Sequence, residues 1–90
     1  VDAIFFCNDD LAQGALLAAQ RLKIKVPQQL AIVGFNDLTG SDLIGPGLTT
    51  IRQDVVALGE AAGSLMIAQL NGEDVEPIIL PTELVIRTSA

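Results

Sequence analysis

The hydrophobic positions of this chain form short continuous runs that alternate with longer stretches of helical spacing. The apolar runs at 3–7 and 30–35 are typical of strands that are buried on both faces. The residues between them, about 9–23, predict a helix with one core-facing side, formed by Ala12, Ala15, Leu16, Ala19 and Leu22. Pro27 marks the turn after this helix.

The second half of the chain continues the alternation. Residues 48–51 predict a short strand, and a helix is expected over about 55–71, capped by Asp54 and ended by Asn71 and Gly72. Two further strands are expected at 78–80 and 84–86, separated by Pro81. Strands buried on both faces that alternate with helices predict an α/β fold, in which helices cover a parallel sheet.

The composition suggests that this chain is part of a larger protein. The chain has 90 residues, of which 50% are hydrophobic and 18% are charged. Because so small a domain buries only a modest fraction of its surface, we expect other chain to cover part of this apolar content. The sequence starts at Val1 without an initiator methionine, which is typical of a piece of a longer protein.

Charge and cysteine content narrow the classes of partner. The net charge of −6 argues against binding of a nucleic-acid backbone by this segment, since that requires clustered Lys and Arg. One cysteine cannot form an internal disulfide, and no paired Cys/His pattern indicates a metal. The apolar runs are shorter than the roughly 18 residues of a membrane span. We therefore expect a cytoplasmic protein without metal or cofactor.

Polar residues follow the first two predicted strands. Ligands of open parallel α/β sheets bind beyond the carboxyl ends of the strands, where Asn8-Asp9-Asp10 and Asn36-Asp37 fall. Amide and carboxylate groups suit a polyhydroxylated ligand. Asp9 and Asp10 are better explained as helix-capping and first-turn acids. Asn8 and the Asn36-Asp37 pair could contact a ligand, or the pair could simply form a turn.

Catalytic patterns are sparse, so we do not expect an enzyme. The chain has no His, and its glycines form no phosphate-binding loop. Cys7 has no visible activator and is expected to be a buried structural thiol. One alternative is a Mg²⁺-dependent phosphoacceptor module that uses Asp9, Asp10 and Asp37. It is weakened because both lysines lie at the far end of the first helix.

The first predicted helix also carries a second face, away from the core. Gln13, Leu17 and Gln20 share it, so that a leucine lies between uncharged amides. Such a face is typical of a protein interface, although a single exposed leucine is also normal on a surface. We favour an interface.

Four segments in order resemble the lactose/galactose-repressor family of transcription regulators. Residues 6–16, FCNDDLAQGAL, are similar to the family's "NDxxAxGA" segment. Residues 26–37 contain VP and LAIVGFND, similar to "vPxdiavvGfDd". LTTIRQ at 48–53 resembles "LTTvrq", and LPTELVIR at 80–87 resembles "lpteLvvR". The series covers nearly the whole chain.

The resemblance implies a type I periplasmic-binding-protein-like domain with two lobes and an effector between them. Residues of about 1–50 and 83–90 would belong to the C-terminal lobe, and about 54–81 to the N-terminal lobe. The hinge crossings would lie at Arg52-Gln53 and Pro81-Thr82. The family's DNA-binding helix-turn-helix would lie outside this chain. Family homodimer contacts fall on the first helix and the 40–45 loop, which adds Leu43 and Ile44 to the interface.

The resemblance also implies effector contacts at Asn8 and Asn36, and we add the neighbouring Asp37. The family commonly has Asp where Asn36 stands. A buried carboxylate repels an anion, whereas an amide tolerates one, so we expect a sugar acid. The amino-acid sequence of these segments resembles that of gluconate-utilisation repressors, and gluconate is the expected effector. The main alternative is the solute-binding protein of a sugar transporter, which shares the fold.

Overall fold

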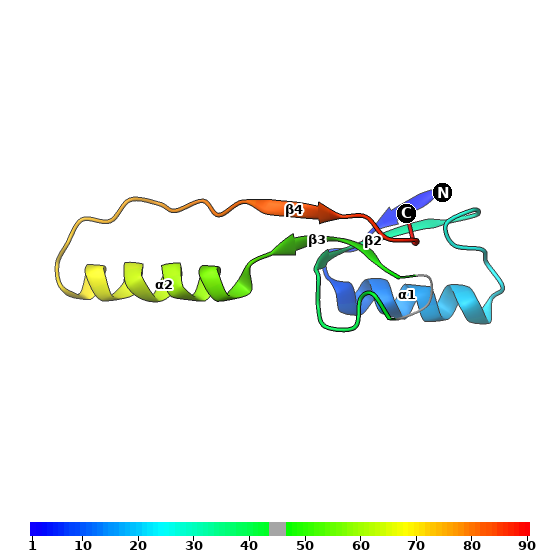
Figure 1. The fold of residues 1–90 in the computed structure, drawn as a ribbon, viewed down its shortest axis with the longest axis horizontal. Coiled ribbons are helices and arrows are strands. Elements are labelled where there is room, and N and C mark those ends of the chain that lie inside the picture. Colours follow the sequence, from blue (N-terminus) through cyan, green and yellow to red (C-terminus); the bar gives the residue numbers. More distant parts are fainter. Residues whose placement is uncertain (44–46) are drawn as a thin grey trace. The chain divides into compact units, whose positions relative to one another are not determined.

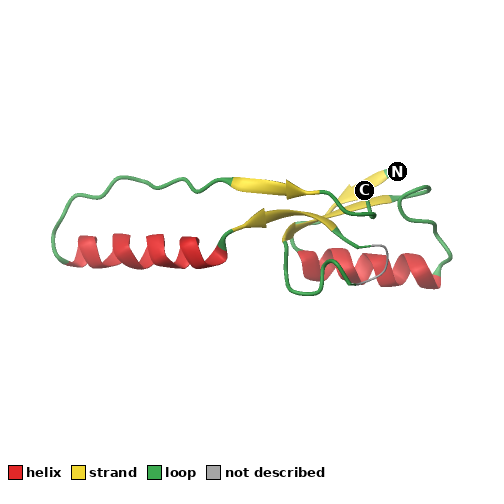
Figure 2. Cartoon of the chain, viewed as in Figure 1, coloured by secondary structure: helices red, strands yellow, loops and turns green. Residues whose placement is uncertain are grey.

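The computed structural model describes residues 1–43 and 47–90, so the predicted interface residue Ile44 lies outside the described residues. The chain divides into two compact units, residues 1–52 with 83–90, and residues 53–82. Figures 1 and 2 show the elements, which are listed here in chain order: β1 (Ala3–Phe5), α1 (Asp9–Arg21), β2 (Ala31–Asn36), β3 (Thr49–Gln53), α2 (Val55–Leu70) and β4 (Thr82–Val85). The predicted α/β class is confirmed.

A mostly parallel sheet organises the first unit. Its order is β1-β2-β3-β4, and β2 pairs in parallel with both β1 and β3. Helix α1 packs against this sheet through a small core of Ala12, Leu16, Ile32 and Leu48. These residues come from the apolar stripe of α1 and from the sheet and the segment entering it, so one hydrophobic contact sets the position of the helix.

Local signals explain both ends of α1. Asn8 is the N-cap, and its Oδ1 accepts a hydrogen bond from the Leu11 N–H at 2.9 Å. At the other end Lys23 has a φ of 56°, and the Ile24 N–H bonds back to the Ala19 carbonyl at 2.9 Å. The helix therefore ends two residues earlier than the pattern predicted.

Two strand predictions were wrong in part. The first strand is short, and Ile4 and Phe5 are 37% and 61% exposed, because the side chains of β1, at the edge of the sheet, have a neighbouring strand on one side only. Residues 78–80 form no strand. A strand requires a hydrogen-bonding neighbour, and in the described sheet it is β4 that has such a neighbour, not residues 78–80. β4 also begins two residues earlier than the strand predicted at 84–86.

The second unit contains α2. The Asp54 carboxylate caps it by accepting from the Ala57 N–H at 2.9 Å. It ends in a Schellman motif, in which Gly72 has a φ of 77° and the N–H groups of Gly72 and Glu73 bond to the carbonyls of Gln69 and Ala68. No residue of α2 is buried. In the described part of the chain, no helix is long and apolar enough to cross a membrane.

Ser89 ties the C-terminal tail to the first unit. Its hydroxyl donates to the Ile32 carbonyl at 2.6 Å and accepts from the Thr49 N–H at 2.8 Å. Its backbone N–H donates to the Gly47 carbonyl, and its carbonyl accepts from Ile32. Ser89 is fully buried and joins the starting halves of β2 and β3, at the edge of the sheet opposite to the strand ends.

Candidate functional site

The candidate site lies where the first two strands end. Because β1 and β2 are parallel neighbours, with Phe5 opposite Val33, their carboxyl ends point to the same edge of the sheet. Asn8 follows β1, and Asn36 is the last residue of β2. The two polar clusters predicted from the sequence therefore share one edge, as open α/β sheets require for a ligand site. We call this edge the rim.

Asn8 is half-buried and has a structural role as well as a candidate binding role. Its Oδ1 caps α1, as described above. The same side-chain amide carries an NH₂ group, which is a donor suited to hydroxyl or carboxylate oxygens. The cap fixes the amide in space, so Asn8 presents a pre-oriented group at the rim.

Asn36 and Asp37 turn the chain sharply at the rim. Their φ values are 115° and 58°, which L side chains rarely adopt and which Asn and Asp tolerate best. Asn36 lies opposite Arg52 in the pairing of β2 with β3. These angles show that the pair does form a turn, as considered from the sequence. Unusual backbone angles of this kind also cluster at functional sites, which fits the candidate role of the pair in binding.

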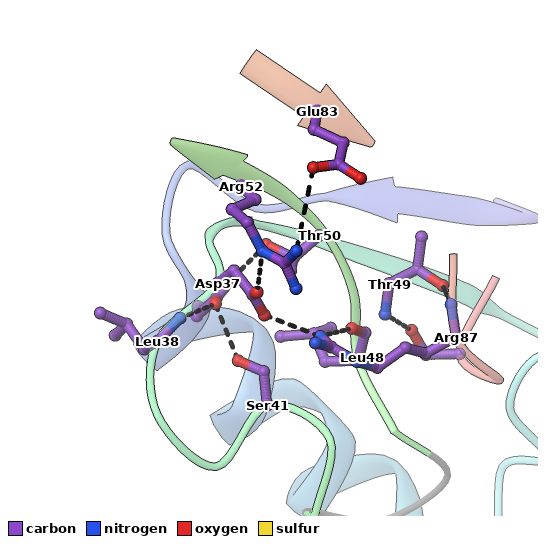
Figure 3. Close-up of polar contacts among 11 residues, drawn as sticks. Asp37, Leu38, Ser41, Leu48, Thr49, Thr50, Arg52, Glu83 and Arg87 are labelled. Carbon is purple, nitrogen blue, oxygen red and sulfur yellow. Dashed lines mark hydrogen bonds and ion pairs between the residues drawn. The ribbon is translucent and has the colours of Figure 1, made fainter. Parts of the chain in front are cut away.

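Two arginines hold the carboxylate of Asp37 (Figure 3). Arg52 Nε lies 2.7 Å from Oδ2, and Arg87 Nη1 lies 2.8 Å from Oδ1. Burial alone would raise the pKa of Asp37, but the hydrogen bonds and charges of Arg87 and Arg52 outweigh it and lower that pKa below its usual value. Arg52 also faces Glu83 at 3.8 Å. Asp37 is therefore an ionised anchor at the rim.

Asp9 has a role that the sequence pattern did not predict. It lies in the first turn of α1, as expected, but Asn8 is the cap and Asp9 is fully buried. Its Oδ2 accepts hydrogen bonds from the Leu38 N–H at 2.7 Å and from Ser41 Oγ at 2.8 Å, and its Oδ1 accepts from Thr50 Oγ1 at 2.6 Å. One signal was available: position 9 continues the buried stripe of α1, formed by Ala12, Leu16 and Ala19.

These contacts weaken the phosphoacceptor alternative. Asp9 and Asp37 point their oxygens at hydrogen-bond donors, whereas a Mg²⁺ site needs them to point at the ion. No group of three potential metal-binding side chains occurs within residues 1–43 and 47–90. Cys7, expected to be buried, is exposed, because it follows an edge strand.

The described residues of the predicted interface lie on α1 and in the loop that follows β2. On α1, Leu17 is 53% exposed, Gln20 is exposed and Gln13 is half-buried, while Leu43, in the loop that follows β2, is 81% exposed. The chain passes from one compact unit to the other between Arg52 and Gln53 and between Thr82 and Glu83. The first passage lies within the expected hinge Arg52-Gln53, and the second directly follows the expected hinge Pro81-Thr82. Their role as hinges stays a prediction.

Comparison with known proteins gives consistent matches. The model of the periplasmic binding protein-like domain matches residues 2–90. The HTH-type transcriptional regulator GntR of Pseudomonas aeruginosa is 53% identical over 75 residues, which cover 83% of this chain and 22% of that protein. The lactose operon repressor of Rhizobium radiobacter is 38% identical over 90 residues, which cover 99% of this chain and 80% of that protein.

Among solved structures, the transcription regulator GntR of Chromobacterium violaceum is 41% identical with a TM-score of 0.84, covering 98% of this chain and 33% of that one. The chain thus spans about a third of that regulator and 22% of the GntR of Pseudomonas aeruginosa. The family resemblance noted in the four sequence segments is confirmed. This chain belongs to the LacI family of transcription regulators and forms part of their periplasmic binding protein-like domain.

Proposed function

We propose that this chain is part of the effector-binding domain of a transcriptional repressor that senses a sugar or sugar acid. The observation that carries the proposal is the placement of Asn8 and Asn36 on one rim of a parallel sheet. Structures of similar regulators support the class of effector, since the transcriptional regulator CelR was solved with cellobiose and a Lactobacillus casei regulator with sucrose. Asp37 remains a candidate for effector contact beside its ion pairs.

Within this class we propose an acidic sugar, with gluconate as the first candidate. Asn36 adds no negative charge at the rim. The neighbouring carboxylate of Asp37 is paired with two arginines, so its charge is largely compensated. An anionic ligand would therefore not meet an isolated negative charge beside Asn36.

The test is isothermal titration calorimetry of the full-length protein with D-gluconate and D-glucose. We expect gluconate to bind more tightly. Asn36→Asp should weaken gluconate binding by about tenfold or more, because two like charges about 4 Å apart cost roughly 1 to 4 kcal/mol. Asn36→Gly is the matched control, since it removes the amide without adding charge and suits a φ of 115°. Glucose binding at least as tightly as gluconate would exclude the sugar-acid assignment.

We propose that the effector acts by two-site linkage. It would bind one arrangement of the two units better than another and so change the affinity of the repressor for DNA. Arg52-Gln53 and Pro81-Thr82 lie at or beside the junctions between the units and are the proposed hinges. A repressor that binds operator DNA through a helix-turn-helix would work in the cytoplasm. A signal peptide on the full-length protein would instead support the solute-binding alternative.

We also propose a homodimer through α1 and the loop that follows β2. Leu17→Glu should leave folding intact, because Leu17 is already 53% exposed, but should weaken the dimer by placing a charge in the interface. Sedimentation velocity measures the loss. Leu11→Glu is the control, since Leu11 is 52% exposed on a different side of the same helix. If Leu17→Glu sediments as an undiminished dimer, this face is not the interface.

A further inference from the structure

We infer that Asp9 is a positioning residue for effector recognition, which sets where Asn36 lies relative to Asn8. The inference rests on the proposed function, because it takes these two amides as effector contacts. Asp9 follows Asn8 directly in the sequence, and its carboxylate holds the loop that follows Asn36 and Asp37. One buried side chain thus joins the two halves of the rim.

The hydrogen bonds of Asp9 divide into two sets. Oδ2 faces the loop, where it accepts from the Leu38 N–H and from Ser41 Oγ. Oδ1 faces the sheet, where it accepts from Thr50 Oγ1 of β3. Figure 3 shows Leu38 and Ser41 on the loop that follows β2, and Thr50 on β3. The carboxylate therefore connects the start of α1 to two other segments.

The contact with Leu38 matters most for the rim. Two residues with positive φ precede Leu38, and its N–H donates to the Asp9 carboxylate. A part-buried N–H without an acceptor costs about 1–3 kcal/mol. Because Asp9 accepts from the Leu38 N–H, it stabilises the sharp turn at Asn36-Asp37 relative to other conformations of this loop. Without that acceptor, the turn loses a direct link to α1.

A carboxylate suits this position well. Three donors converge on it, and a carboxylate accepts all three without bringing a donor of its own. Space is also tight, because a Cβ on Gly34 would overlap Oδ1 of Asp9. Close packing leaves the carboxylate little freedom, which makes it a rigid link between α1 and the loop.

The experiment compares substitutions by calorimetry of the full-length protein with D-gluconate. Asp9→Ala removes both loop-facing bonds and should weaken binding by about tenfold or more. Asp9→Asn should restore the affinity to within about threefold, because its oxygen can face Leu38 while its NH₂ donates to the Thr50 hydroxyl. An unchanged affinity in folded Asp9→Ala would overturn the inference.

Ser89→Ala is the matched control for lost stability. Ser89 is equally buried and multiply hydrogen-bonded, but it lies at the opposite edge of the sheet. Ser89→Ala should lower the melting temperature but leave the affinity for gluconate within about twofold of the unmodified protein, since the hydrogen-bond partners of Ser89 are remote from the rim. If Ser89→Ala weakens gluconate binding as much as Asp9→Ala at matched stability, the effect is one of stability and the inference fails.

A second measurement does not depend on the effector or on the folding of Asp9→Ala. Ser41→Ala removes one loop-facing bond, and it should speed amide hydrogen exchange over residues 37–41, while Ser89→Ala should not. Equal exchange of this loop in both variants would overturn the inference. If the unmodified protein binds neither gluconate nor glucose, the effector assignment fails, and the exchange result alone decides whether Asp9 positions the rim.

Discussion

Gly34→Ala is expected to destabilise the protein by about 3 kcal/mol or more, because the site has no room for a methyl group. A Cβ there would overlap Oδ1 of Asp9 and lie 3.0 Å from Leu48 Cδ2 and 3.2 Å from Ala12 Cβ. Relief would require either the helix or the buried carboxylate to move, and both are held by the core and by hydrogen bonds. Urea denaturation of the full-length protein measures the loss.

Gly14→Ala is the control for the general effect of replacing glycine. Gly14 lies in α1 with nothing within 4 Å of a Cβ, so alanine should be neutral or stabilise by up to about 1 kcal/mol. A double-mutant cycle then identifies the clash: Asp9→Ser should cost less in the Gly34→Ala background than alone. Equal stability of Gly34→Ala and Gly14→Ala would show that the strand and helix are not packed this closely.

Asp37→Asn is expected to remove a pH-dependent contribution to stability. The pKa of Asp37 is lowered in the folded chain, because the hydrogen bonds and charges of Arg87 and Arg52 outweigh the burial that would raise it. A lowered carboxyl pKa stabilises the fold above the unfolded value of about 3.9, and this contribution is lost as the pH falls through the folded value. At neutral pH the substitution should cost roughly 1–3 kcal/mol, since it leaves the mostly buried Arg87 without its charged partner.

The measurement is the free energy of unfolding of both proteins from pH 7 to pH 2. The difference between them should be largest at neutral pH and should shrink as the pH falls below about 4, where Asp37 of the unfolded chain becomes protonated, and on through its lowered pKa in the folded chain. Asp42→Asn is the control, because Asp42 is an exposed acid in the loop that follows β2. A difference that does not change with pH would contradict an ionised Asp37 bound by two arginines.

The chain's own signals predict most of its local structure. The apolar spacing placed α1 and α2 within two residues of their ends, and Asn71-Gly72 marked the Schellman turn. Such features depend on neighbours within about five residues, so a local pattern contains the necessary information. The polar clusters at the strand ends were likewise predictable, because parallel pairing brings those ends to one edge.

Other features depended on contacts that no local pattern encodes. Asp9 meets donors 29, 32 and 41 positions away, and Asp37 pairs with Arg52 and Arg87 from the β3 and β4 sides of the sheet. The sequence alone determined the α/β class, the two helices and the residues of the rim, because hydrophobic periodicity and helix caps act locally. Only the tertiary structure decided that Asp9 is a buried link and that β1 is an exposed edge strand. Burial and hydrogen-bond partners are set by segments far apart in the chain.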